Sequence, residues 1–284
     1  MTSQLGNCGG SCSSAKGRSE SEAAVSAPIT LGLFAGAAAL VLAFIAIELR
    51  SPAPLLPMRI FRLRTLTAAN SAMAIVGAVA FSEFFLLTLY LQDVLHYSAM
   101  QSGAAFVGFA GAVVVVSNVA QAIVGRIGVR PTLTAGLLAS AVSVGLLTRL
   151  PVHGHYFWDL FPWFVLGGAG MGLSFVPVTI ASLTGVERAD AGVASGLINT
   201  SRQIGGAIGL AAVSAIAATA TSSYATAHAT LATSGVALDH GFQTALYVLT
   251  GLLVAGALIA VALLKPARVE PAEEEELLPL QEAA

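Results

Sequence analysis

The sequence has few charged residues. Of 284 residues, 10% are Asp, Glu, Lys or Arg, whereas a soluble domain typically carries about 25%. Hydrophobic residues make up 56%, and the mean hydropathy is +0.82. Because so few charges cannot cover a water-exposed surface, we expect most of the chain to lie in lipid. The formal net charge of −2 gives no support to a nucleic-acid partner, which requires clustered Lys and Arg.

Cysteine and the common catalytic motifs are also scarce. The two cysteines, Cys8 and Cys12, lie in a Ser/Gly-rich stretch without a neighbouring His, so they cannot complete a zinc site. The sequence has no H-E-x-x-H, no G-x-S-x-G and no phosphate-binding G-x-x-x-x-G-K-[ST] motif. We therefore expect no enzyme activity, no metal and no cofactor.

Long apolar runs dominate what is present. A helix needs about 20 mainly apolar residues to cross a bilayer, and the continuous Leu/Ala/Gly-rich runs do not alternate as barrel strands do. Residues 1–27 are polar, without the basic-then-apolar pattern of a secretory signal, and are predicted to be a disordered tail. The predicted fold is all-α, a polytopic transmembrane bundle of about seven helices. They cover approximately residues 29–48, 66–91, 101–125, 131–150, 157–183, 192–218 and 243–264.

Basic residues fall in every second connection. They are Arg50, Arg59, Arg62, Arg64, Arg126, Arg130, Arg188, Lys265 and Arg268. The opposite connections, 92–100, 151–156 and 219–242, contain no Lys or Arg, and Arg149 lies at the edge of one of them. Short cytoplasmic loops are enriched in these residues. We predict a multi-pass protein of the plasma or inner membrane, with the N-terminus outside and the acidic tail 267–284 in the cytoplasm.

Polar side chains inside the predicted helices are the candidates for function, because they are costly in lipid. Glu83 lies in the second helix, flanked by Phe81, Phe84 and Phe85. Its functional interpretation is a proton or cation-substrate site, and its structural one is a protonated or paired residue near a helix end. The other substrate or proton pathway candidates are Asn118 and Gln121 in the third helix and Asn199, Arg202 and Gln203 in the sixth.

The sixth-helix residues share one face with Gly192, Ser195, Gly196 and Gly206, as their three- and four-residue spacing requires. This face either lines a path or bonds to neighbouring helices, and the two interpretations carry equal weight. Small residues also recur at Gly168, Gly170 and Gly172 before Pro177, and at Gly205 and Gly209. Their spacing predicts tight helix packing, with a kink or break at Pro177.

The run from Ala194 to Gly209, ASGLINTSRQIGGAIG, resembles the penultimate-helix signature of the fourteen-helix drug:proton antiporters of the major facilitator superfamily. The segment Pro54–Arg62 resembles that family's cytoplasmic linker, with Met58 and Ile60 as departures. Tyr90-Leu-Gln92 with Tyr97-Ser98 resembles the next helix end and outer turn. Arg126 and Arg130 lie in the loop that corresponds to the family's cytoplasmic gate. The family usually has Asp just before the first of these arginines, whereas this chain has Gly125, so the resemblance does not support a charge-paired gate in this loop.

The resemblance covers about residues 28–266 and implies the eighth to fourteenth helices of such a transporter. In the family, the missing helices hold the proton-coupling carboxylate and arginine, and the substrate cavity lies between two halves. The implied function is proton-coupled multidrug or small-molecule efflux. The implied partners are the bilayer, small amphiphilic substrates, protons, and a complementary N-terminal half or a second copy.

We expect a truncated half with little autonomous activity. The alternatives are a seven-helix receptor or a non-transporting membrane subunit. The receptor alternative includes light-sensing retinal proteins, which need a lysine in the middle of the last helix. The lysine nearest that position here, Lys265, lies at the cytoplasmic edge, which counts against a retinal protein.

Overall fold

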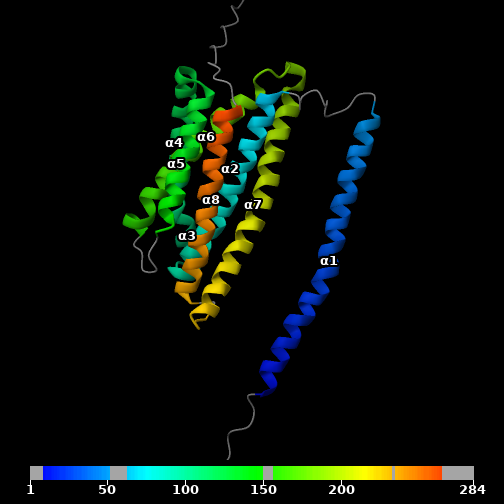
Figure 1. Cartoon of the computed structure of the whole chain (residues 1–284), viewed down its shortest axis with the longest axis vertical. Helices are drawn as coiled ribbons and strands as arrows, with labels where there is room; N and C mark the ends of the chain where they lie inside the picture. The colour runs from blue at the N-terminus through cyan, green and yellow to red at the C-terminus, as the bar shows by residue number, and fades with distance from the viewer. Residues whose placement is uncertain (1–8, 52–62, 150–155, 232–233, 264–284) are drawn as a thin grey trace, which may run out of the picture. The chain divides into compact units, whose positions relative to one another are not determined.

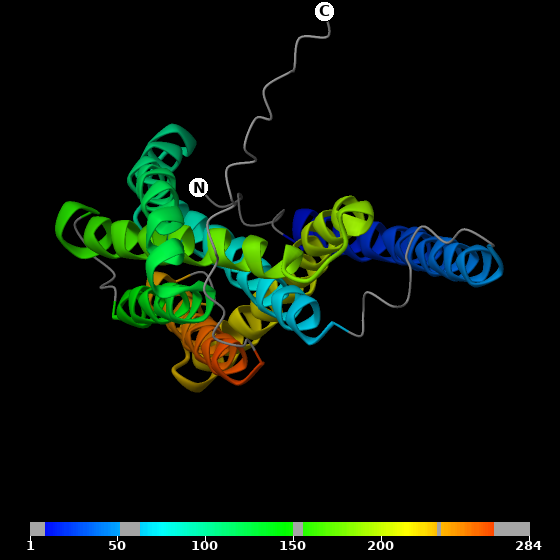
Figure 2. The same ribbon diagram turned by 90° about the horizontal axis from the view of Figure 1, so that it is seen from above.

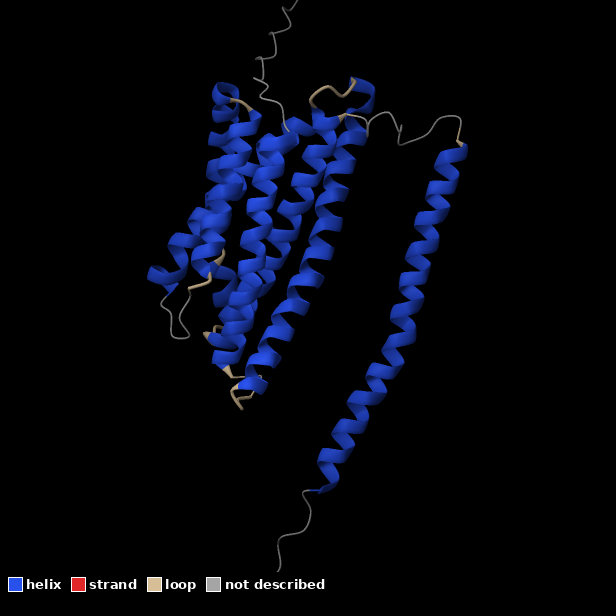
Figure 3. Cartoon of the chain, viewed as in Figure 1, coloured by secondary structure: helices blue, strands red, loops and turns tan. Residues whose placement is uncertain are grey.

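The computed structural model describes residues 9–51, 63–149, 156–231 and 234–263. Within these ranges the chain is helical and forms no strand, as Figure 3 shows. The chain divides into two units, Met1–Pro57 and Met58–Ala284, which are described separately. The predicted all-α class is therefore confirmed.

The first unit contains a single described helix, α1 (Gly9–Arg50, blue in Figure 1), with Pro28 inside it. Its apolar part, Leu31–Arg50, has the 20 residues needed to cross a bilayer. The helix begins at Gly9, so it differs from the predicted disordered tail over residues 9–27. Hydrogen bonds in a helix are local. This stretch is proline-free and contains four Ala, two Glu and one Lys, which favour helix without an apolar face.

The second unit contains six long helical segments, each crossing the length of the unit (Figure 1). Short π or 3₁₀ turns extend three of them, and α3 precedes α4 in one span. The elements are α2 (Arg64–Leu89) with η2 (Tyr90–Val94), α3 (Ala99–Ala105), α4 (Val107–Ile127), α5 (Val129–Leu147), η3 (Tyr156–Leu160), α6 (Phe161–Leu183), η4 (Arg188–Asp190), α7 (Ala191–Ala227) and α8 (Gly235–Leu263). With α1, seven helices in the described residues are long and apolar enough to span a membrane, which confirms the predicted number.

Two helices extend beyond the predicted spans. α7 continues to Ala227 and α8 begins at Gly235, whereas a long connection was expected over residues 219–242. The extension of α7 is rich in Ala, Thr and Ser, whose hydroxyls bond to carbonyls one turn earlier. Examples are the bonds from Thr219 to Ala215 at 2.8 Å and from Thr226 to Ser222 at 2.9 Å. Hydropathy fails to predict these turns because they are helical without being apolar.

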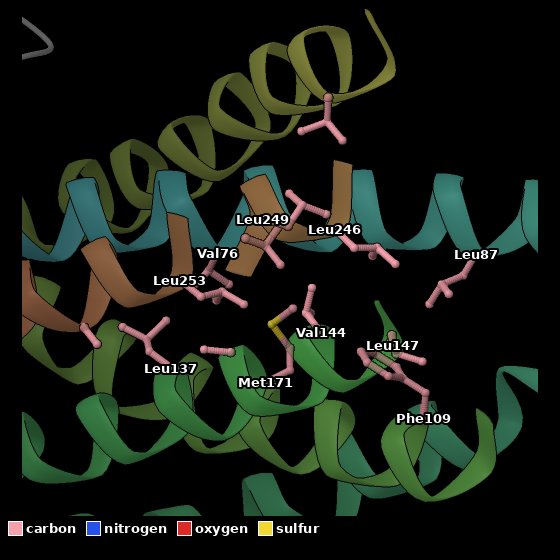
Figure 4. Close-up of a cluster of buried hydrophobic side chains, with 14 of the residues drawn as sticks. Val76, Leu87, Phe109, Leu137, Val144, Leu147, Met171, Leu246, Leu249 and Leu253 are labelled. Carbon is pink, nitrogen blue, oxygen red and sulfur yellow. The ribbon is translucent and has the colours of Figure 1, made fainter. Parts of the chain in front are cut away.

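The core lies between α2, α5, α6 and α8. In the second unit, α2 packs against α7, α8 and α6, while α6 also packs against α4 and α5, and α5 packs against α8 (Figure 2). Leucine, valine and methionine side chains from these four helices meet in one cluster (Figure 4). The cluster includes Val76, Leu137, Val144, Met171, Leu249 and Leu253.

Small residues let the helix backbones approach closely. A Cβ at Gly205 would collide with the backbone of Ala74, and one at Gly77 would collide with the backbone carbonyl of Arg202. α2 and α7 therefore touch through main-chain atoms. Gly128, with φ of 92°, makes the one-residue turn between α4 and α5 in a conformation that L side chains rarely adopt.

Successive spans of the second unit run in opposite directions, which gathers charges at its two ends (Figure 1). The arginines at the end that we call the basic end are Arg64, Arg126, Arg130 and Arg188. The opposite end, the far end, carries Asp93, Asp159 and Asp239, together with Arg149. The remaining predicted cations of this unit, Arg59, Arg62, Lys265 and Arg268, and the acidic tail lie outside the described residues.

Candidate functional site

Glu83 is buried in the second unit. It lies on α2 with 4% of its surface exposed, one turn from Val79 and one turn from Leu87, which both belong to the core cluster. Its Oε1 atom is buried without a hydrogen-bond partner among the described residues. Buried polar atoms are nearly always hydrogen-bonded, so an unpaired carboxyl oxygen here calls for an explanation such as a proton, a water or a ligand.

Aromatic rings lie beside this part of α2. Phe84 stacks on Phe106 with ring centroids 4.7 Å apart and meets Phe109 edge-on at 5.2 Å. Phe106 in turn stacks on Phe164 at 5.3 Å. The sequence indicated the Phe residues next to Glu83 but not three others, Phe106, Phe109 and Phe164. Phe106 directly precedes α4, Phe109 lies in α4 and Phe164 lies in α6, and only the fold brings these helices to α2.

The α4 candidates lie on a face that the described residues of the second unit leave open. Asn118 and Gln121 are exposed, on the same side as Val114. The Asn118 side-chain amide donates to the carbonyl of Val114 at 2.8 Å, within its own helix. This bond reduces the cost of an amide in an apolar setting but leaves its carbonyl oxygen for another partner.

The α7 candidates also lie toward an open face. Asn199 and Gln203 are exposed, while Arg202 is half-buried and its guanidinium donates to the Asn199 side-chain oxygen at 3.0 Å. Gly206, which the spacing placed on the same face, is instead buried against the ring of Phe81. The predicted stripe is thus divided between a polar open edge and a packed edge toward α2.

The other surface helices of this unit differ in character. The exposed side chains of α5 between residues 131 and 142 are Pro131, Ala135, Leu138 and Val142, and those of α8 include Val254, Leu258 and Val261. Such faces suit contact with lipid tails. The open faces of α4 and α7 mix apolar residues with amides and a guanidinium, which suits contact with water, substrate or another polar helix.

A groove of about 280 Å³ lies between α2 and α7 toward the basic end. Its lining combines hydroxyl and amide groups with Leu and Ala side chains, and the Ser201 hydroxyl donates to the Asn70 side-chain oxygen at 2.7 Å across the two helices. Its lining residues are Leu66, Thr67, Asn70, Ser71, Ala74, Leu197 and Ser201. Asn70 was not among the sequence candidates, because a single amide near a predicted helix end gives no signal of its own.

The remaining candidates occupy loop and packing positions. Arg126 is exposed and Arg130 half-buried on either side of Gly128 at the basic end. Gly168 and Gly172 face the backbone of α4, as Gly205 and Gly209 face α2. Across the described residues, no group of three or more His, Cys, Asp or Glu side chains is arranged to hold a metal.

Comparison with known proteins adds a family to this geometry. The Major Facilitator Superfamily model matches residues 15–210. The cephamycin export protein CmcT of Amycolatopsis lactamdurans is 36% identical over 82% of this chain and 48% of its own length. The puromycin resistance protein pur8 of Streptomyces alboniger is 30% identical over 87% of this chain and 50% of its own. The tetracenomycin C resistance and export protein of Streptomyces glaucescens is 31% identical, covering 66% and 35% respectively.

Proposed function

Because this chain belongs to the major facilitator superfamily, we propose that it forms the carboxy-terminal half of a proton-coupled exporter of small molecules. The chain spans about half the length of the relatives it matches, which supports the assignment to one half. The names of these relatives refer to export of, or resistance to, antibiotics, so a small amphiphilic compound is the class of substrate we propose. Membership of this transporter family argues against the alternative of a seven-helix receptor.

The observation that carries the proposal is the contrast between open helix faces. α5 and α8 expose apolar side chains, whereas α4 and α7 expose Asn118, Gln121, Asn199 and Gln203. Polar groups facing lipid would each cost free energy, since the hydrocarbon layer offers no hydrogen-bond partners. We therefore assign the α4 and α7 faces to a water-containing substrate path completed by a complementary half or a second copy.

Glu83 is the proposed proton site of this half. A carboxyl group within a core of Val and Leu side chains is costly when ionised, so the binding of a proton or a cationic substrate changes its free energy strongly. The unpaired Oε1 supports this assignment, because a purely structural carboxyl would be expected to have both oxygens satisfied.

The position of the basic end indicates how the chain is oriented in the membrane. Arg64, Arg126, Arg130 and Arg188 gather there, and short cytoplasmic connections are enriched in Lys and Arg. We propose that the basic end faces the cytoplasm. The Asn70–Ser201 groove then lies near the cytoplasmic opening, where a substrate would first meet hydrogen-bonding groups.

The test is efflux from a completed transporter. This chain, fused behind the amino-terminal half of the Amycolatopsis relative, is placed in everted membrane vesicles energised by a pH gradient. The movement of a cationic amphiphilic dye into the vesicle lumen, which corresponds to efflux from a cell, is recorded. Glu83→Gln should reduce proton-driven efflux to the level of vesicles without transporter. Ser82→Ala is the matched control, because it alters the adjacent buried side chain, whose hydroxyl also lacks a partner among the described residues, without removing a carboxyl group.

Two results would count against the proposal. A fusion that inserts and is folded but moves no dye or other amphiphile under a pH gradient would contradict the export function. Efflux by Glu83→Gln with the same pH dependence as the unsubstituted fusion would remove Glu83 from proton coupling while leaving the export function in place.

A further inference from the structure

A small cavity lies at the far end of the second unit, where η2 meets the ends of α5 and α8. Its volume of about 10 Å³ is at the lower limit for one water molecule. The lining is apolar except for three side chains, Tyr90, Asp239 and Gln243. The apolar lining residues are Leu86, Leu87, Leu147, Phe242 and Leu246. A carboxyl group, a phenol and an amide thus converge on a space suited to one bound water.

The three polar groups are held in place by the fold. The Gln243 side-chain amide donates to Asp239 Oδ2 at 2.7 Å, one turn along α8. Tyr90 is 2% exposed, while Asp239 is half-buried and lines the cavity. A water in the cavity would have two or three polar partners, which is what buried waters normally have.

The charges around Asp239 come from several elements. Asp239 and Asp159 both lie close enough to Tyr90 to interact with it electrostatically, and His240 interacts with Asp239. On α7, Tyr224 stacks on His240 with centroids 4.6 Å apart and on His228 at 4.0 Å. Among the described residues, further ionisable groups at this end are Asp93, His96, Tyr97, Arg149 and Tyr156. Asp239 therefore interacts with the phenol of Tyr90, the ring of His240 and the amide of Gln243.

We propose that Asp239, Gln243 and Tyr90 form a proton-binding site, with one bound water, at the far end of the bundle. A proton from the adjoining aqueous phase binds to the ionised carboxylate of Asp239, and the neutral acid that results donates its hydrogen to the cavity water. Proton binding removes a charge from an apolar lining, which supplies the driving force. The proposal does not depend on transport, because it concerns an equilibrium of this chain alone.

The site is separate from Glu83. Tyr90 follows Glu83 by seven residues, which is about 10 Å along α2, and places both on the same side of the helix. Leu86 and Leu87 line the cavity and lie between Glu83 and Tyr90 along the helix. Asp239 and Glu83 are thus expected to titrate as two sites divided by an apolar layer.

Infrared spectroscopy measures this protonation directly. The full chain is purified into lipid nanodiscs, and the carbonyl band of protonated carboxyl groups is followed from acidic to alkaline pH. One component should be lost as the pH rises and should be missing at all pH values in Asp239→Asn. Asp93→Asn, which removes an exposed carboxylate from the same end, should keep that component.

Gln243→Leu provides a second measurement if Asp239→Asn does not fold. Losing a hydrogen bond to the carboxylate should move the midpoint of that band's titration upward by roughly 0.5 to 1 pH unit. A band that persists in folded Asp239→Asn, or a midpoint unchanged in Gln243→Leu, would overturn the proposal. Glu83→Gln should remove a different component, so failure at Asp239 is distinguishable from failure at Glu83.

Discussion

Replacing Gly205 by Ala should destabilise the bundle, even though alanine favours helix. Gly205 lies on α7 where that helix meets α2, and an added Cβ would collide with the carbonyl oxygen, Cα and carbonyl carbon of Ala74. All three are main-chain atoms, so relief requires the two helices to separate rather than a side chain to rotate. The cost therefore falls on the whole α2–α7 contact.

The size of the effect follows from two opposing contributions. Overpacking typically costs about 1–3 kcal/mol, and a backbone obstacle places this position at the upper end. Alanine in place of glycine returns about 1 kcal/mol through helix propensity. The net loss in the free energy of unfolding should be about 2 kcal/mol, which changes the folded-to-unfolded ratio more than tenfold.

The comparison needs a glycine on the same helix without a neighbour. Gly196 meets this condition, because nothing lies within 4 Å of its added Cβ. Equilibrium unfolding of the purified chain in mixed micelles should show a lower midpoint for Gly205→Ala and an equal or higher midpoint for Gly196→Ala. Equal stability of the two variants would refute the close backbone contact between α2 and α7.

Two further predictions concern the same bundle. Asn70→Ala should lower the free energy of unfolding by about 1 kcal/mol, because it removes the bond from Ser201, while Thr200→Ala, whose hydroxyl bonds within α7, should cost less. The orientation is tested in a chain with Cys8 and Cys12 replaced by Ser. Met100→Cys should react with an impermeant thiol reagent in intact cells, whereas Arg126→Cys should react only after permeabilisation. The reverse pattern would contradict the proposed orientation.

The spans were predictable because hydropathy depends on local sequence. Each described transmembrane helix includes most of an apolar run found in the sequence, and the number seven is confirmed. The helix ends were less predictable where helices continue through polar residues. Residues 9–27 and the Thr/Ser-rich end of α7 are helical because main-chain hydrogen bonds do not require apolar side chains.

For the candidate site, the sequence indicates which residues are candidates but not how they are arranged. Glu83 was identifiable as an acidic residue in an apolar run, yet its unpaired oxygen depends on which helices surround α2. The division of the α7 stripe, with Gly206 buried and Gln203 open, follows from the contact with Phe81. Asn70 and the cavity beside Asp239 depend on contacts between distant segments, which spacing along one helix does not encode.

The most direct measurement asks whether water reaches the open faces of α4 and α7. Asn118→Cys, Asn199→Cys and Ala135→Cys are placed singly in the Cys-free fusion with the complementary half, and a charged thiol reagent is applied to permeabilised membranes. Because only hydrated thiolates react, the account predicts labelling at positions 118 and 199 and protection at the lipid-facing α5 position 135. Labelling at 135 with protection at 118 and 199 would contradict a substrate path along α4 and α7.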